Sequence, residues 1–504
     1  MAWEDQAVKR VRLATPFVFL TLTALAHAHV GSTDIFLEGK AGPYQLFVTV
    51  RPPLTIPGVA EIEVRSESAG VREIKAVPLA IKGAGSKLAP IPDALKVSAN
   101  DPKFFVGQLW MMTSGSWQAR LTVEGAQGEG TLSIPVPAVA RASKRMQLGL
   151  GLILSCVGIF LVTGLVAIVG ASVREARLDP GQTPAPTDLR RGRKATIIGA
   201  VIVLAIVFGG NAWWNSEAQQ YDTRIYKPLR MAASLKGSEL HLRMTEPGWM
   251  QAISLEQAAF RVFTRKMDDL IPDHGHIMHL YMIRQPGLDV IYHLHPDERD
   301  TGSFVLPLPS TEGGHYKLYA DIVHADGFPE TLTSEIDLPA LAARPLAGDD
   351  AFAQGEPWQK STPNTVFTLP DGYKMEWLRP SQAIHARQGM SFNFRLLKPD
   401  GTTPADMSLY MGMLGHAAFV KTDGTVFAHI HPNGSISMAA LMLAEGMPAD
   451  MKMDSAQGVL PNAVGFPFGF PSPGKYRIFV QMKHAETVET GIFDVDCLLP
   501  IQNG

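Results

Sequence analysis

The sequence predicts a mainly β protein in which two transmembrane helices separate the first of three antiparallel sandwich domains from the other two. Short runs that alternate apolar and polar residues, such as YQLFVTV at 44–50, recur over most of the chain and are broken by Gly and Pro. Two longer uncharged apolar runs interrupt this pattern. A chain of 504 residues is long enough for about three domains. We expect immunoglobulin-like or cupredoxin-like sandwiches at 29–140, 231–345 and 372–498, with a linker at 346–371.

The N-terminus has the pattern of a secretory signal. Basic residues precede an apolar stretch that ends in Ala26-His27-Ala28, which fits cleavage at this point and predicts a signal peptide at 1–28. Cleavage makes His29 the first residue, and a terminal His can chelate copper through its amine and its ring. Copper-resistance proteins of the CopC type start in this way, so His29 is a weaker candidate ligand. Residues 30–138 contain no second His to complete such a site.

Two apolar segments, 147–171 and 195–214, are long enough to cross a bilayer. The loop between them, 172–194, carries six basic residues, whereas three precede the first segment. By the positive-inside rule the loop is cytoplasmic and the flanking domains are periplasmic, which places the protein in the cytoplasmic (inner) membrane. Neither segment has a charged residue at its centre, so we interpret both as an anchor rather than an ion path.

A histidine-bearing stretch occurs twice, as HGHIMHLYMIRQPGLDVIYHLHP at 274–296 and as HAAFVKTDGTVFAHIHP at 416–432. In the second copy, Asp423-Gly424 predicts a two-residue type I′ hairpin that pairs Thr422 with Thr425. This register places His416 opposite His431, with His429 on the same face.

In the first copy a three-residue loop, 286–288, pairs Gln285 with Asp289 and sets His279 opposite His295. A further His recurs eight residues after a Tyr, in YKLYADIVH at 316–324 and YRIFVQMKH at 476–484. Each repeat is thus expected to hold its own metal ion with four imidazoles, His279, His293, His295 and His324 in one and His416, His429, His431 and His484 in the other.

Neutral imidazole is the commonest protein ligand for copper, zinc and nickel, so these are the expected cofactors. Thioethers select copper(I), which makes Met411, Met413 and Met438 weaker candidates and favours copper. The alternatives are that the histidines form a solvated polar face and that Met438 packs a short helix. Four histidines without a counterpart in the other repeat are predicted to be polar surface or outer groups: His274, His276, His315 and His385.

Other classes of function are disfavoured. The formal net charge of −3 provides no basic field for a nucleic-acid partner. The chain has two cysteines, one of them inside an apolar run, so a thiolate metal site is excluded.

The segment FFVGQLWMMTSGSWQARLTVEG at 104–125, and the motifs Phe-Ala-His-Ile-His-Pro and Pro-Gly-Lys-Tyr of the second repeat, resemble the YtkA-like and FixH-like periplasmic, copper-associated β-sandwich domains. In the repeats the resemblance covers 260–338 and 390–495. It implies a periplasmic metal-handling or respiratory-assembly context.

The leading hypothesis is a membrane-anchored periplasmic metal-binding protein for copper storage, delivery or resistance, whose partner is a periplasmic copper protein or a membrane complex. A second hypothesis is a structural or assembly subunit that binds no metal. A third is a histidine-ligated metal-dependent enzyme, because three imidazoles with an open position also hold catalytic ions. The sequence has no motif for a nucleophile or an acid/base pair.

Overall fold

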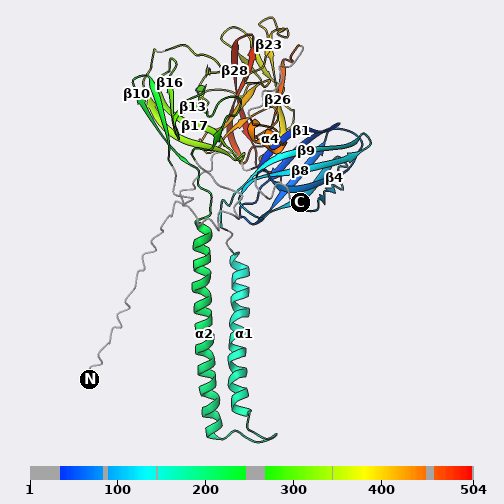
Figure 1. Cartoon of the computed structure of the whole chain (residues 1–504), viewed down its shortest axis with the longest axis vertical. Helices are drawn as coiled ribbons and strands as arrows, with labels where there is room; N and C mark the ends of the chain where they lie inside the picture. The colour runs from blue at the N-terminus through cyan, green and yellow to red at the C-terminus, as the bar shows by residue number, and fades with distance from the viewer. Residues whose placement is uncertain are drawn as a thin grey trace, which may run out of the picture.

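The computed structural model describes residues 34–82, 89–143, 146–245, 267–342, 344–449 and 459–501. Within them the protein is mainly β with antiparallel sheets, as predicted. Figure 1 shows a head of packed sheets from which two long helices project. The predicted signal peptide and His29 lie outside the described residues.

The N-terminal region contributes two sheets whose buried residues share one hydrophobic core. The strand order of the first sheet is β1 (Ile35–Ala41), β2 (Tyr44–Arg51), β3 (Gly58–Ser66), β7 (Phe104–Met111) and β6 (Lys96–Val97). That of the second is β5 (Asp93–Ala94), β4 (Val71–Ala80), β8 (Gly115–Gly125) and β9 (Gly128–Ala138). The alternating runs of the sequence therefore form strands with one face in the core.

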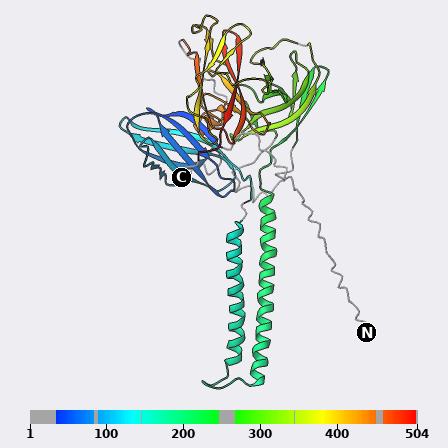
Figure 2. The same cartoon turned by 180° about the vertical axis from the view of Figure 1, so that it is seen from behind.

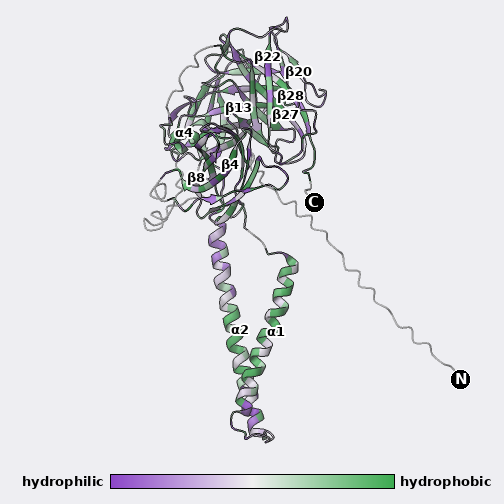
Figure 3. Cartoon of the chain, turned by 90° about the vertical axis from the view of Figure 1, so that its right-hand side faces the viewer, coloured by the Kyte–Doolittle hydropathy of each residue, from purple (hydrophilic) through white to green (hydrophobic). Residues whose placement is uncertain are grey.

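Two helices follow, α1 (Leu148–Glu175) and α2 (Pro186–Asp222), and both are long and apolar enough to cross a membrane, with mean hydropathies of 2.8 and 2.2 over their most apolar windows. Figure 3 shows the hydrophobic stretch along α1 and the middle of α2. Helix α1 extends beyond its predicted span at the C-terminal end, and α2 extends beyond its span at both ends. Helix α2 starts within the predicted loop, where Pro186 is its first residue and the Asp188 carboxylate accepts from the Ala185 amide at 3.1 Å. A Cβ on Gly170 would lie 2.0 Å from Thr196 Oγ1, so α1 and α2 approach closely there.

The second region also contributes two sheets around one core. One has the order β10 (Arg230–Lys236), β11 (Glu239–Thr245), β16 (Ser303–Pro307), β15 (Asp297–Asp300). The other has the order β12 (Leu270–Ile271), β17 (Gly314–His324), β13 (His279–Gln285), β14 (Val290–Leu294), β19 (Ala351–Gln354), and β18 (Pro329–Leu338) also pairs with β17.

The third region has the same plan. One sheet has the order β20 (Val366–Thr368), β21 (Lys374–Trp377), β22 (Met390–Leu397), β26 (Ala463–Phe468). The other has the order β23 (Met407–Ser408), β27 (Gly474–His484), β24 (His416–Lys421), β25 (Phe427–Ile430), with β28 (Thr487–Cys497) also on β27 and the short helix α4 (Met438–Ala444) after β25. Strands β19 and β20 lie within the predicted linker, which is therefore partly built into the sheets.

The predicted register of both hairpins is confirmed. Ala417 pairs with Ile430 in the second, and Tyr281 pairs with His293 in the first. The predicted type I′ turn is wrong. Of its two central residues only Gly424 has a positive φ, of 70°, and its amide donates to the Lys421 carbonyl, so the chain turns one residue earlier while the strands keep their alignment.

The hairpins of the two repeats pack face to face. Leu280 and Met282 point into the core of their own region, whereas Tyr281 and Ile283 point the other way and join a buried cluster with Ala418 and other residues of the third region. Because successive residues of a strand face opposite sides, His279 must share the inter-repeat side with Tyr281. The same alternation places His416 on that side with Ala418.

Strand β1 of the N-terminal region pairs with the loop that follows His431. The Glu38 amide donates to the Asn433 carbonyl, and the Ser435 amide donates to the Phe36 carbonyl, each at 2.9 Å. A Cβ at Gly434 would lie 1.9 Å from the Phe36 carbonyl oxygen, so only glycine fits this close approach. Figures 1 and 2 place the third region between the other two.

Candidate metal centre

Eight histidines of the two repeats meet at one end of the inter-repeat core. They are linked by ring contacts with centroid distances between 3.9 and 6.3 Å. The members are His274, His276, His279, His293, His295, His416, His429 and His431. The expectation that each repeat holds its own site is wrong for the second repeat, whose set includes a histidine of the first, and both hairpins present their imidazoles to the same interface.

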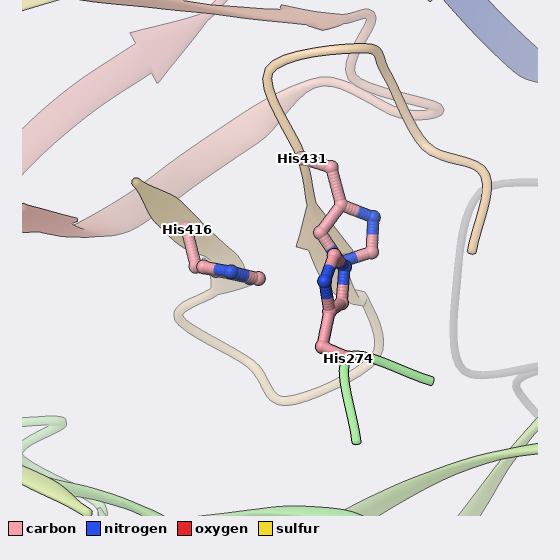
Figure 4. A group of neighbouring side chains, drawn as sticks. All are labelled: His274, His416 and His431. Carbon is pink, nitrogen blue, oxygen red and sulfur yellow. The ribbon is translucent and has the colours of Figure 1, made fainter. Parts of the chain in front are cut away.

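Two sets of three histidines within this cluster have ligand atoms that all lie within 4.8 Å of one another. The first set, His279, His293 and His295, comes entirely from the hairpin β13–β14. The second set joins His416 and His431 of the other hairpin to His274, which precedes β13 in the first repeat. Figure 4 shows these three rings pointing toward one another from separate segments.

Hydrogen bonds fix which ring nitrogen carries the proton in the first set. His279 Nε2 lies 3.0 Å from the Asp273 carbonyl oxygen, and His293 Nδ1 lies 2.9 Å from Gln481 Oε1. Both oxygens can only accept, so these two nitrogens are protonated and the opposite nitrogen of each ring carries a lone pair. The two lone-pair nitrogens, His279 Nδ1 and His293 Nε2, face each other at 3.2 Å.

The second repeat reproduces this arrangement. His416 Nε2 lies 3.2 Å from the Tyr410 carbonyl oxygen, and His429 Nδ1 lies 3.3 Å from the Asp321 carboxylate. The remaining nitrogens, His416 Nδ1 and His429 Nε2, are 3.1 Å apart. Two imidazole ligands of a tetrahedral ion at 2.0–2.1 Å are separated by about 3.3 Å, so both pairs have the spacing of metal ligands.

Three further imidazole nitrogens in the cluster are buried and have no hydrogen-bond partner within the described residues: His274 Nε2, His295 Nε2 and His431 Nε2. His431 donates through Nδ1 to the Ile436 carbonyl at 2.8 Å, and His295 Nδ1 lies 3.3 Å from Asp350 Oδ1. A buried nitrogen without a partner is costly, and a bound cation would satisfy it. The Ile436 carbonyl and the Asp350 carboxylate orient the rings of His431 and His295 and leave the lone pair of each Nε2 free.

Burial holds these imidazoles neutral. It lowers the pKa of His279 to about 3 and, together with the nearby His431, that of His274 to about 3. The pKa values of three others are lowered by burial first and by neighbouring imidazoles second: His293, His416 and His429. Neutral imidazole is the form that binds metal, so a cation need not displace protons at neutral pH.

The prediction that His274 is polar surface or an outer group is wrong, because His274 belongs to the second set. His276 lies 3.4 Å from the Asp349 carboxylate and outside both sets, which fits an outer group. Both histidines belong to a tight turn, 273–276, in which Asp273 and His276 pair. The turn at 410–413 repeats it, since Tyr410 pairs with Met413 and Met411, like His274, has a φ near 50°. Gly275 and Gly412 each stand four residues before the first hairpin His, and that shared offset could have revealed the match between His-Gly-His and Met-Gly-Met.

His324 does not join the cluster. It is buried between two carboxylates, with Nδ1 at 2.6 Å from Asp269 and Nε2 at 3.2 Å from Glu330. Burial alone would lower the pKa of His324, but the two carboxylates outweigh it and raise the pKa to about 9. Glu330 also accepts from Tyr226 Oη and from the Leu229 amide. A charged His324 thus holds the connector between α2 and β10.

His484 also lies apart from the cluster. Its Nε2 is 3.3 Å from Glu489 and 3.7 Å from Asp371, and the Tyr373 ring stacks on it with centroids 4.2 Å apart. Burial and the nearby Asp371 raise the pKa of Glu489 to about 7. These three groups could hold an ion, but with two carboxylates and one imidazole they differ in chemistry from the hairpin sets.

The methionines take two positions. A small buried apolar cluster contains Met413 together with Met438 and Met442 of α4. Met438 therefore has the packing role that was the alternative to metal ligation. Met411 is buried in the turn beside His274, whose ring it hydrogen-bonds through its backbone.

A cavity of about 230 Å³ borders the cluster. Its lining includes His279, His429 and His431 of the cluster, and Arg141 and Tyr226 of the segments that flank α1 and α2. Its wall also carries Asp34, Asp273, Asp321 and Glu330. Glu330 is paired with the charged His324, and burial raises the pKa of Asp321 to about 7, so Asp34 and Asp273 are the carboxylates that accompany Arg141 in this lining.

Residues 235–338 and 365–497, which contain the two repeats, are similar to a family described as a domain of unknown function, DUF8832. The comparison with curated proteins gives no match.

Solved structures with some likeness include a tetra-tandem repeat of a large adhesion protein and a 1.5-MDa bacterial ice-binding adhesin. The first shares 8% identity over 88% of this chain and 71% of its own, and the second shares 6% identity over 88% of this chain and 92% of its own. Each has a TM-score of 0.15. A membrane-anchored protein of Corynebacterium diphtheriae shares 10% identity over 94% of this chain and 96% of its own, also with a TM-score of 0.15. Likenesses this slight carry no argument about function.

Proposed function

We propose that this protein binds transition-metal ions in the histidine cluster between its two repeats and presents them outside the cytoplasmic membrane. The observation that carries the proposal is the pair of imidazole contacts, His279 with His293 and His416 with His429, in which two lone-pair nitrogens face each other at 3.2 and 3.1 Å. Such a contact is repulsive without a shared proton, and a cation between the nitrogens converts it into two ligand bonds.

Copper is the ion that the donors fit best. The two sets consist of neutral imidazoles, which suit copper(II), zinc and nickel alike, and buried Met411 lies in the turn beside His274. Methionine is a soft ligand, and its presence in the turn that bonds His274 favours copper over zinc, because copper also has a monovalent state that prefers soft ligands.

The rest of the chain fits an anchored carrier. Helices α1 and α2 hold the head at the membrane, and the basic loop between them faces the cytoplasm. Each pair of sheets forms one sandwich domain, immunoglobulin-like or cupredoxin-like in plan. The cavity lined by His279, His429 and His431 offers a periplasmic copper protein or a membrane complex a route for exchanging an ion with the cluster. Storage, delivery and resistance all require such an exchangeable site.

The test is metal analysis of the full-length protein in detergent. After loading with copper(II) or zinc and removal of unbound ion, we expect about two ions per chain. His279→Ala and His416→Ala should each lose about one ion, since each removes one of the facing nitrogens.

His315→Ala and His385→Ala are the controls, because these histidines lie outside the cluster and bond to Asp337 and to the Leu499 carbonyl. The proposal fails if the parent retains no more metal than the double variant His279→Ala/His416→Ala. That result would favour an assembly subunit without metal.

A further inference from the structure

The two three-histidine sets are direct neighbours. His429 of the second repeat has its ring 5.5 Å from that of His279 and 5.6 Å from that of His293, both in the first set. The rings of His293 and His416 are 6.3 Å apart. Only imidazole rings separate the two sets along these contacts.

His274 ties the sets together. It comes from the first repeat, yet its ring lies 5.0 Å from His416 and 4.9 Å from His431, while it is 6.1 Å from His279. Its buried Nε2 has no partner among the described residues. The second set therefore draws a donor from the repeat that builds the first, so the second set is incomplete without the first repeat.

We infer that the two sets form one dinuclear centre, in which two ions lie close enough to interact magnetically and electrostatically. This inference rests on the proposed function. The second cation enters the field of the first in a buried site, so it should bind more weakly, by roughly 10-fold or more. The matched hairpins supply the near-symmetry of such a centre. Its two halves differ chemically, because the second set includes His274 and the Met411 backbone that bonds to it, whereas the first set consists of His279, His293 and His295.

The experiment is electron paramagnetic resonance of the full-length protein in detergent, titrated with copper(II). With up to one equivalent we expect the spectrum of isolated copper(II). With two equivalents we expect broadening or loss of that spectrum and a half-field transition from coupled spins. Acid release of the metal, with assay of its oxidation state, distinguishes coupling from reduction to copper(I).

Two matched samples sharpen the result. His416→Ala with excess copper should show only the isolated spectrum, and so should the parent loaded with one equivalent of copper and one of zinc. His385→Ala should keep the coupled spectrum.

Two equivalents of bound copper with two isolated spectra would overturn the dinuclear centre while leaving metal binding intact. A single ion that survives either single variant and is lost only in His279→Ala/His416→Ala would also overturn it. Absence of any bound metal would instead overturn the proposed function itself.

Discussion

The hairpin histidines and the strand-end histidines recur with equal regularity in the two repeats, yet the structure gives them opposite environments. His293 is buried with a neutral amide as its acceptor and other imidazoles as neighbours, and burial drives its pKa well below the ordinary value. His324 is equally buried but lies between Asp269 and Glu330, which raise its pKa to about 9. Repetition of a residue thus shows that its position matters, whereas its partners decide whether it offers a lone pair or a charge.

The largest expected difference is in metal affinity. His293→Ala removes one of two facing nitrogens and should weaken copper(II) or zinc binding at its set by roughly 100-fold or more, since even loss of an outer partner costs 10- to 100-fold. His324→Ala should leave affinity within about 3-fold of the parent. Competition titration of the full-length protein against a chelator measures both. Equal losses in the two variants would refute the distinction.

In the metal-free protein, substitution of His324 should lower the stability of the fold more than substitution of His293. His324→Gln removes the cation from a buried pair of carboxylates, and breaking such a pair costs about 3–5 kcal/mol. His293→Gln removes one of two facing lone pairs and should cost much less. Thermal unfolding of both variants in the presence of a chelator compares them. A larger loss for His293→Gln would mean that the facing nitrogens share a stabilising proton.

The pH dependence follows from the sign of the shift at His324. Its pKa is raised from 6.5 to about 9 in the folded protein, so its protonation contributes stability that is fully present below pH 6.5 and is lost as the pH rises through about 9. The contribution is about 3 kcal/mol. The stability gap between the parent and His324→Gln should therefore narrow between pH 6.5 and 9. A gap that stays constant over this window would rule out a charged His324.

The smallest expected effect concerns the acceptor of His293. Gln481→Ala removes the oxygen that fixes the ring of His293, and should lower metal affinity by about 10- to 100-fold without abolishing binding. Gln359→Ala is the matched control, because that glutamine is exposed and bonds to the Pro286 carbonyl. If Gln481→Ala binds like the control, the neighbouring Tyr410 hydroxyl, 3.2 Å from His293 Nδ1, is sufficient to orient the ring.

The hairpin geometry could be predicted from sequence because it is local. A strand period of two and a short turn fix which residues are opposite, and the register held although the turn type at Gly424 was wrong. The predominance of strands and the two apolar helices are likewise local patterns.

The shared cluster could not be predicted because it depends on the packing of two sheets. Tyr281 and Ala418 look like ordinary strand residues, and nothing in their spacing shows that they meet across the repeats. His274 was missed because its counterpart is Met411, a different residue type in an equivalent turn. The carboxylates of His324 lie 55 and 6 residues away in sequence, and the farther one, Asp269, cannot be assigned by offset.

The pairing of β1 with the loop after His431 has a consequence for biosynthesis. Phe36 and Ser435 are 399 residues apart, and at 5–20 residues per second the ribosome needs roughly 20–80 s to make the chain between them. Until then the edge of β1 lacks its partner and the loop beside His431 does not exist. The cluster is therefore among the last parts of the head to assemble, after α1 and α2 are made and only when nearly the whole chain has been synthesised.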